Sequence, residues 1–194
     1  MPEMYPVFLK LEGRDVLVVG AGKVAWRKAQ ALQRAGARLR CVAPDVCDEI
    51  RAVPDIHIIQ RAWRPDDCEG AFMVVAATGD AQLNAEIREA AHATGALVNA
   101  VDDPPNCDFY VPAIARIGDL MVAVSTQGKA PLVAGRVRAH LEKLLPRELE
   151  QVINTIATER EKLLASEPDE ATRLLKLREV LKAELARYQI DLHD

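Results

Sequence analysis

The sequence predicts a protein of the α/β class, in which a parallel sheet covered by helices is followed by a small α+β segment and a helical end. Five short apolar runs lie in the first part of the 194-residue chain, and helix-patterned segments separate several of them. Each run is continuously hydrophobic, which is typical of strands buried on both faces of a parallel sheet. Beyond the fifth run, the pattern changes to a short hairpin and then to longer helices.

The predicted strands and helices alternate along the chain. The five strands cover residues 15–19, 38–43, 56–59, 72–77 and 96–101. Residues 24–35 and 81–94 predict helices, and the second of these places Leu83 and Ile87 on one side. Strands that alternate with helices indicate βαβ units and therefore a parallel sheet.

A hairpin is predicted after the fifth strand. Pro104 and Pro105 can continue neither a strand nor a helix. Two apolar segments, residues 108–116 and 120–124, flank a turn at Gly118. Two such segments around a short turn predict an antiparallel pair.

Helices are predicted for the rest of the chain. Pro131 suits the first position of a helix that runs to about residue 145. Residues 147–194 contain no glycine and are interrupted at Pro168, which predicts two helices with Ser166 or Asp169 as the N-cap of the second. The second helix has an apolar face made by Leu174, Leu177, Leu181, Leu185 and Tyr188.

Composition and charge exclude several functions. The chain has 25 Lys and Arg against 29 Asp and Glu, and only 4% of its residues are aromatic, which disfavours nucleic-acid binding. No apolar run reaches the roughly 18 residues of a membrane-spanning helix. The first residues lack the basic flank and apolar run of a signal peptide, so we expect a cytoplasmic protein.

The cysteines and histidines are scattered along the chain. Cys41, Cys47, Cys68 and Cys107 form no CxxC pair, and the four histidines are equally dispersed. Spacing of this kind disfavours both a zinc site and a disulfide framework. We therefore expect reduced thiols and no protein-bound metal.

A glycine turn between the first strand and the first helix is the clearest chemical motif. Residues 20–25 read Gly-Ala-Gly-Lys-Val-Ala. Gly20 permits the tight turn, Gly22 lets a pyrophosphate approach the backbone, and Ala25 lets helix and strand pack closely. The free N–H groups of the helix start would bind the phosphates. The motif predicts a Rossmann-like dinucleotide-binding domain; the alternative is a turn that binds nothing.

The residues after the second strand do not decide which side chain would bind the ribose of the cofactor. Pro44 and Asp45 follow the strand, and Asp45 is either a ligand of a ribose hydroxyl or a simple turn residue. Arg38 and Arg40 lie within the strand instead of at its carboxyl end, which is weak support for NADP. NAD is therefore the preferred cofactor.

Polar residues follow the fourth and fifth strands. Asp102 and Asp103 stand at the carboxyl end of the fifth strand, the edge at which such sheets bind ligands. A carboxylate there could exchange a proton during hydride transfer; the alternative is that both aspartates cap the loop before Pro104. Thr78, Gly79 and Asp80 follow the fourth strand and, with Asn84, would border the same cleft; the alternative is that Asp80 simply caps the next helix.

A second polar loop precedes the helix at Pro131. Residues 125–130 combine hydroxyl groups with Gly128 and Lys129, and Arg116, Arg136 and Arg138 belong to the same part of the chain. Cations gathered in an acidic protein indicate an anionic ligand. The alternative is a solvated helix face.

Taken together, these motifs resemble those of a known family. Residues 20–28 are similar to its GGGxVAxRK motif, and residues 99–104 with Cys107 resemble its NVVDD element. Residues 125–131 resemble its STGGxSP loop, although Gln127 and Ala130 replace a glycine and a serine. Over about residues 5–146 the chain resembles the precorrin-2 dehydrogenases, which also form the dehydrogenase and ferrochelatase part of sirohaem synthases.

The resemblance implies NAD-dependent oxidation of precorrin-2 to sirohydrochlorin, followed in some members by insertion of ferrous iron. It implies Asp102 as the general acid or base. Cofactor contacts are expected from Gly20, Ala21, Gly22, Lys23, Val24, Pro44, Asp45, Ala77 and Thr78. Contacts with the many carboxylates of the tetrapyrrole are expected from Arg116, Ser125, Thr126, Gly128, Lys129 and Arg136.

The resemblance also implies a division of the chain and a partner. Residues 1–112 would form the NAD-binding domain, residues 113–146 a dimerisation segment of a homodimer, and residues 147–194 a helical end. Precorrin-2 or sirohydrochlorin would be the ligand, with neither nucleic acid nor membrane as a partner. The alternative function is an NAD-binding sensor module that catalyses nothing, which would need the glycine turn but not Asp102.

Overall fold

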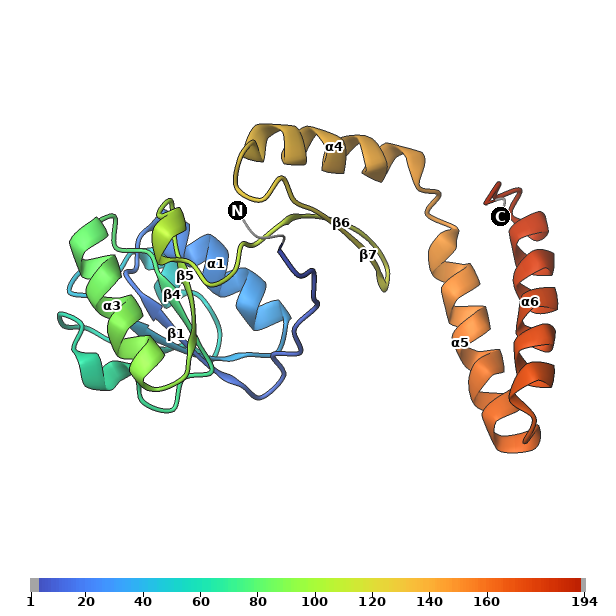
Figure 1. The fold of residues 1–194 in the computed structure, drawn as a ribbon, viewed down its shortest axis with the longest axis horizontal. Helices are drawn as coiled ribbons and strands as arrows, with labels where there is room; N and C mark the ends of the chain where they lie inside the picture. The colour runs from blue at the N-terminus through green and yellow to red at the C-terminus, as the bar shows by residue number, and fades with distance from the viewer. Residues whose placement is uncertain (1–3, 193–194) are drawn as a thin grey trace. The chain divides into compact units, whose positions relative to one another are not determined.

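The structure is a computed structural model that describes residues 4–192, and it divides into two compact units (Figure 1). Tyr110 ends the first unit and Val111 begins the second. Residues 1–3 and 193–194 lie outside the described part of the chain, so the expectation about a signal peptide falls partly beyond it. In the part of the chain that the structure describes, no helix is both long and apolar enough to cross a membrane.

The first unit contains a five-stranded sheet in which every neighbouring pair is parallel. Its strands are β1 (Asp15–Val19), β2 (Arg38–Val42), β3 (His57–Ile59), β4 (Met73–Ala76) and β5 (Leu97–Ala100). Their order is β3-β2-β1-β4-β5, so the direction of winding reverses between β1 and β4. Sheets of this kind bind ligands beyond the carboxyl ends of the strands at that reversal.

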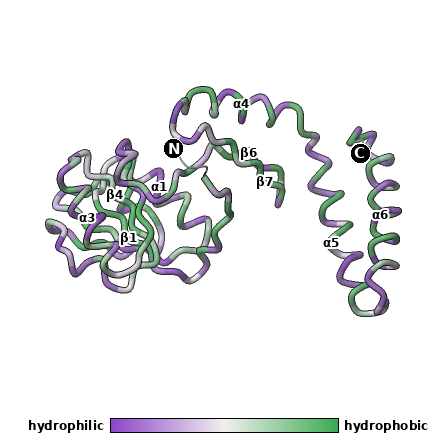
Figure 2. The backbone as a smooth tube through the Cα atoms, in the orientation of Figure 1, coloured by the Kyte–Doolittle hydropathy of each residue, from purple (hydrophilic) through white to green (hydrophobic). Residues whose placement is uncertain are grey.

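The centre of the sheet is buried on both faces. On β1, Val16 and Val18 belong to one apolar cluster, and Leu17 and Val19 belong to another on the opposite face. All four are at most 2% exposed, which explains the unbroken hydrophobic run in the sequence. Figure 2 shows β1 and β4 among the most hydrophobic parts of the backbone. The predicted α/β fold is confirmed.

Helices cover both faces of the sheet. Helix α1 (Lys23–Arg34) buries Ala25 and Ala29 in the first cluster, and α3 (Ala81–Ala93) buries Ile87 and Ala91 in the second. Three shorter helical segments were not predicted: α2 (Asp48–Arg51) and the 3₁₀ turns η1 (Pro65–Cys68) and η2 (Pro104–Asn106). Segments of three or four residues are too short to show a helical hydrophobic period.

The second unit begins with the predicted antiparallel hairpin. Strands β6 (Ala113–Ile117) and β7 (Leu120–Val124) pair with Ile117 opposite Leu120. The sequence pattern placed the start of the first strand at residue 108, which is wrong by five residues. The reason is that the Asp108 carboxylate accepts a hydrogen bond from the Val98 amide at 2.8 Å, which ties residue 108 to the first unit.

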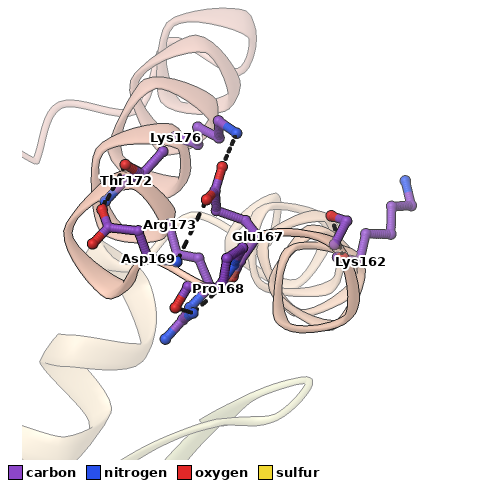
Figure 3. Close-up of polar contacts among 8 residues, drawn as sticks. Lys162, Glu167, Pro168, Asp169, Thr172, Arg173 and Lys176 are labelled. Carbon is purple, nitrogen blue, oxygen red and sulfur yellow. Dashed lines mark hydrogen bonds and ion pairs between the residues drawn. The ribbon is translucent and has the colours of Figure 1, made fainter.

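Three helices complete the second unit. They are α4 (Pro131–Leu144), α5 (Leu149–Ser166) and α6 (Glu170–Arg187), and the last two form a hairpin. Asp169 caps α6 by accepting from the Thr172 amide at 2.7 Å, whereas the Ser166 hydroxyl donates back to the Lys162 carbonyl. Of the two predicted caps, Asp169 is therefore confirmed and Ser166 is wrong. Figure 3 shows the contact between Asp169 and Thr172 at the bend between the two helices.

The buried carboxylate of Asp67 in η1 should make the free energy of unfolding depend on pH. Arg61 donates to its two oxygens at 2.6 and 2.7 Å, and the Arg64 amide donates at 2.8 Å. The hydrogen bond from Arg61 holds the pKa of Asp67 below its ordinary value. Because the folded pKa lies below the unfolded one, the ionised carboxylate contributes stability at neutral pH, and this contribution is lost as the pH falls through the folded pKa.

We therefore expect Asp67→Asn to lower the free energy of unfolding by about 1–3 kcal/mol at neutral pH, since a charged acceptor is lost. The difference from the parent protein should shrink as the medium is acidified. Urea unfolding at neutral and acidic pH measures both values. The exposed neighbour Asp66, changed to Asn, is the control and should have little effect. A difference that stays constant with pH would contradict the assignment.

Candidate functional site

A cavity of about 550 Å³ opens beyond the carboxyl ends of the central strands. Its walls come from three segments: the start of α1, the loop after β4 with the start of α3, and the loop after β5. The lining residues are 22–25, 77–79, Ala81, Asn84 and 101–103. The cavity therefore lies at the reversal between β1 and β4, where this type of sheet binds ligands.

Gly20 lies in the turn between β1 and α1, next to this cavity. Its φ is +98°, and a Cβ atom at this position would lie 2.3 Å from the Ala77 carbonyl oxygen. Its amide donates to the Val42 carbonyl at 2.9 Å. Backbone of this conformation, with another backbone against it, accommodates only glycine. Gly20 is thus required by the packing of the protein itself.

Gly22 is different, because no atom of residues 4–192 would crowd a side chain placed there. Its φ is −88°, and a Cβ atom there would meet no atom within 4 Å. Gly22 is the N-cap of α1, and within the described part of the chain no side chain caps the first turn of this helix. The exposed Lys23 follows directly. The first-turn amides of α1 and an adjacent cation therefore face the cavity, which is the arrangement that binds phosphates.

The two aspartates after β5 lie in different surroundings. Asp103 accepts hydrogen bonds from the side-chain amides of Asn84 at 3.4 Å and Asn106 at 2.9 Å. Asn84, only 2% exposed, in turn accepts from the Thr78 hydroxyl at 2.8 Å. This chain of contacts joins the loops after β4 and β5. Asp103 consequently holds one wall of the cavity together.

Asp102 presents a free carboxylate to the cavity. It is exposed, and among residues 4–192 no group donates a hydrogen bond to its side chain. Its φ of +58° lies in the left-handed region, which aspartate tolerates better than most residues. The Val101 amide fixes the preceding residue by donating to the Ala76 carbonyl at 2.8 Å. This exposed carboxylate can accept a proton from a ligand in the cavity.

A buried polar group lies beneath this loop and was not among the predicted site residues. Asn99 on β5 is 6% exposed, and its amide nitrogen donates to the Phe109 carbonyl at 3.0 Å. Its oxygen accepts from the Lys28 ammonium group at 3.4 Å. The signal in the sequence is Lys28 itself, a charged residue three positions after the buried Ala25 on α1.

The predicted cofactor contacts fall into two groups. Gly22, Lys23, Val24, Ala77 and Thr78 line the cavity together with Asp102. Gly20, Ala21, Pro44 and Asp45 are not among the lining residues, although the Cys47 amide ties the loop after β2 to the Ala21 carbonyl at 3.1 Å.

The two arginines of β2 do not lie free near the site. Arg38 forms an ion pair with Asp15 at 2.6 Å, at the start of β1 and β2. Arg40 donates to the Glu69 carbonyl at 2.9 Å. Since both guanidinium groups are engaged away from the carboxyl edge of the sheet, neither supports binding of the 2′-phosphate of NADP.

The predicted tetrapyrrole contacts belong to the second unit. The hydroxyls of Ser125 and Thr126 accept hydrogen bonds from the Gln127 and Ala130 amides, so they fold the loop before α4. Gln127 and Gly128 both have positive φ. The cations Lys129, Arg136 and Arg116 are exposed. Arg138, in contrast, pairs with Glu142 on the same helix.

A glycine turn, an uncapped helix start and a cavity at the reversal of a parallel sheet define a dinucleotide-binding domain. Comparison with known proteins agrees: the chain belongs to the family described as putative NAD(P)-binding, whose model matches residues 7–113. The predicted Rossmann-like fold is thereby confirmed, and the relatives described next bear out the predicted family resemblance.

Relatives and a solved structure extend the comparison beyond this domain. The chain is 40% identical over 185 residues to a siroheme synthase of Ectopseudomonas mendocina, covering 95% of this chain and 40% of that protein. It is 43% identical over 147 residues to a siroheme synthase of Photorhabdus laumondii, covering 74% of this chain and 31% of that protein. The chain therefore spans less than half the length of these curated relatives.

The solved structure of SirC, a precorrin-2 dehydrogenase, is similar to this chain with a TM-score of 0.71 and 28% sequence identity. The match covers 94% of this chain and 100% of that one. The likeness thus includes the second unit as well as the dinucleotide-binding domain.

The residues present fit a nicotinamide dinucleotide. The open space at Gly22 and the uncapped amides of α1 suit a pyrophosphate, and the same cavity continues to Asp102. No group of three or more His, Cys, Asp or Glu side chains in residues 4–192 is arranged to hold a metal ion.

Replacing the two glycines of the turn should have different effects: one replacement should reduce stability and the other should reduce NAD binding. Gly20→Ala should lower the free energy of unfolding by more than about 3 kcal/mol, because the new methyl group collides with backbone. Gly22→Ala should change it by less than about 1 kcal/mol, yet weaken NAD binding at least about tenfold, because the methyl group occupies the space for the pyrophosphate. Urea unfolding and calorimetric titration with NAD measure the two effects.

Each glycine variant serves as the control for the other. Equal losses of stability in both variants would contradict the assignment of Gly20 to the fold. Unchanged NAD affinity in Gly22→Ala would contradict the assignment of Gly22 to the phosphates.

Proposed function

We propose that this protein oxidises precorrin-2 to sirohydrochlorin with NAD⁺ as the hydride acceptor, as a step of sirohaem formation. The observation that carries the proposal is the free carboxylate of Asp102 on the wall of a dinucleotide cavity. The likeness to SirC over that protein's full length supports the same reaction. A module that only senses NAD would need no such carboxylate beside the cofactor.

The reaction removes two hydrogens from the macrocycle, one as hydride and one as a proton. Bound NAD⁺ supplies the hydride acceptor. The chain's own contribution is to take up the proton, and Asp102 is the group placed to do so, because no hydrogen bond within the described residues occupies its oxygens. Asp103 acts differently: bound by Asn84 and Asn106, it keeps the loop in place.

Cofactor binding is assigned to the glycine turn and its neighbours. Gly22, Lys23 and Val24 would hold the pyrophosphate at the start of α1, and Ala77 and Thr78 would border the nicotinamide. Pro44 and Asp45, beyond the end of β2, would lie near the adenine ribose, as in other proteins of this fold.

Substrate binding and dimer formation are assigned to the second unit. The exposed Lys129 and Arg136 form no ion pair within the described part of the chain, so they are available for the carboxylates of a tetrapyrrole. Arg116, Ser125, Thr126 and Gly128 would complete this surface. Helix α4 also exposes Leu132, Val133, Val137 and Leu144, which supports burial of this helix in a homodimer.

The central prediction concerns the two neighbouring aspartates. Asp102→Asn should lower the rate of precorrin-2 oxidation by about two to four orders of magnitude, the usual contribution of a general base, while the NAD affinity changes little. The rate is measured anaerobically from the absorbance of NADH and sirohydrochlorin, and the affinity by calorimetry.

Asp103→Asn is the matched control, because it removes the neighbouring charge without touching the free carboxylate. Its rate should fall far less than that of Asp102→Asn, and its loss should be mainly in stability. Wild-type turnover in Asp102→Asn would remove Asp102 from the mechanism.

The cations of the second unit give a separate prediction. Lys129→Gln and Arg136→Gln should each raise the KM for precorrin-2 about three- to tenfold at low salt and leave the NAD affinity unchanged, because each removes one ionic contact with a carboxylate. Lys182→Gln on α6 is the control for the loss of an exposed cation. An unchanged KM in both loop variants would exclude this surface from substrate binding.

A further inference from the structure

Cys107 contacts both ends of the turn that carries Asp102. It is half-buried and follows η2, and it is not among the residues that line the cavity. Its thiol donates a hydrogen bond to the Ala100 carbonyl at 3.0 Å, and the same sulfur lies 3.4 Å from the Asp103 carbonyl oxygen. These carbonyls belong to the first and last residues of the turn, so the sulfur spans Val101 and Asp102 between them.

The turn receives little support from its own backbone. The Asp103 amide donates to the Ala100 carbonyl at 3.4 Å, which is long for a hydrogen bond between backbone groups. Asp102 is the third residue of the turn and has a φ of +58°, a conformation that turns usually assign to glycine or asparagine. A residue with a Cβ atom keeps this conformation only where surrounding groups hold it. The turn therefore depends on contacts from outside.

The thiol also satisfies a backbone group at the edge of the sheet. β5 is the last strand in the order of the sheet, and Ala100 at its end is only 2% exposed. A buried carbonyl at such an edge requires a hydrogen-bond donor. Burial raises the pKa of the Cys107 thiol, so the sulfur keeps its proton near pH 7 and remains a donor. The bond to the Ala100 carbonyl is therefore available at neutral pH.

The sulfur is placed by the edge of β5 and not by the turn itself. The Asp108 amide donates to the Val98 carbonyl at 2.8 Å, and the Val98 amide donates to the Asp108 carboxylate, also at 2.8 Å. The Asn99 side-chain amide donates to the sulfur at 3.6 Å. Because Asp108 directly follows Cys107, these bonds anchor the cysteine to the strand. The thiol is thus a fixed point that can hold the turn of Asp102.

We propose that Cys107 is a positioning residue for the oxidation: its thiol, through the carbonyls of Ala100 and Asp103, holds the turn in the conformation that presents the Asp102 carboxylate to the cavity. This inference rests on the proposed function, in which Asp102 accepts the proton. It assigns no contact between Cys107 and the substrate or the cofactor, and no chemical reaction to the thiol.

The test compares variants that separate the hydrogen bond from the packing of the sulfur. Cys107→Ala removes the donor, and Cys107→Ser restores a donor without restoring the volume of the sulfur. Cys107→Val keeps the volume but lacks a donor, so it replaces the alanine variant if the smaller side chain prevents folding.

Cys68→Ala is the control for a lost buried thiol. Cys68 is fully buried, and its carbonyl accepts a hydrogen bond from the hydroxyl of Thr94, the C-cap of α3. The cavity borders the start of that helix instead. For each variant, kcat and the KM for precorrin-2 are measured together with NAD affinity and thermal stability.

We expect Cys107→Ala to lower kcat about three- to tenfold, because a misplaced base slows proton transfer. The KM for precorrin-2 and the NAD affinity should stay within about twofold, since the thiol would touch neither ligand. Cys107→Ser should return most of the lost kcat, and Cys107→Val should resemble Cys107→Ala. Cys68→Ala should lower the unfolding temperature and leave kcat unchanged. In an Asp102→Asn background, Cys107→Ala should lower the rate no further.

A second measurement avoids turnover altogether. The exchange of individual backbone amides with solvent is followed by NMR in the cofactor-free protein. The Asp103 amide, which closes the turn, should exchange about three- to tenfold faster in Cys107→Ala and return toward the parent rate in Cys107→Ser. The Val101 amide donates to the Ala76 carbonyl at 2.8 Å, so its exchange should stay the same and serves as the internal reference.

The outcomes separate the inference from the function on which it rests. An unchanged kcat in Cys107→Ala, a serine variant no more active than the alanine variant, or an unchanged exchange rate at Asp103 overturns the role of Cys107 and leaves the dehydrogenase in place. An equal fall of kcat in Cys68→Ala does the same, since it would attribute the loss to instability. A wild-type protein that binds NAD⁺ but does not oxidise precorrin-2 overturns the proposed function, and the inference with it.

Discussion

The close approach of Gly20 to the carbonyl of Ala77 is the constraint on which the site depends. A Cβ atom at Gly20 would lie 2.3 Å from that oxygen, so the end of β1 can meet the loop after β4 only with glycine in a left-handed conformation. The same turn places the start of α1 beside that loop. The uncapped amides of α1, the loop after β4 and the loop after β5 therefore border one cavity.

Two adjacent carboxylates share this cavity, and the hydrogen bonds around them separate their roles. Asp103 accepts from two asparagine amides, one of which is buried and linked to Thr78. Asp102 is exposed, and no group among the described residues donates a hydrogen bond to its oxygens. A carboxylate that is held by hydrogen bonds to neighbouring loops suits a structural role, whereas one without such bonds can exchange protons with a ligand.

The sequence predicted the first unit well, because buried parallel strands and the glycine turn leave strong local patterns. The five predicted runs include every residue of β1 to β5, and Pro131 does begin α4. The start of β6 could not be placed, since the bond from the Val98 amide to Asp108 joins segments ten residues apart. The two adjacent aspartates show in the sequence that an acid is present, but only the hydrogen bonds from Asn84 and Asn106 in the folded protein show that Asp103 is the one engaged. The contact between Lys28 and Asn99 could not be predicted from the sequence, because the two residues are far apart in the chain.

The most direct test is anaerobic incubation of the purified protein with precorrin-2 and NAD⁺, with both chromophores followed by absorbance. The account predicts that sirohydrochlorin and NADH appear together in equal amounts, and that neither forms when the dinucleotide is omitted. Binding of NAD⁺ without any change in the tetrapyrrole spectrum would contradict it, and would leave a dinucleotide-binding domain with a different task.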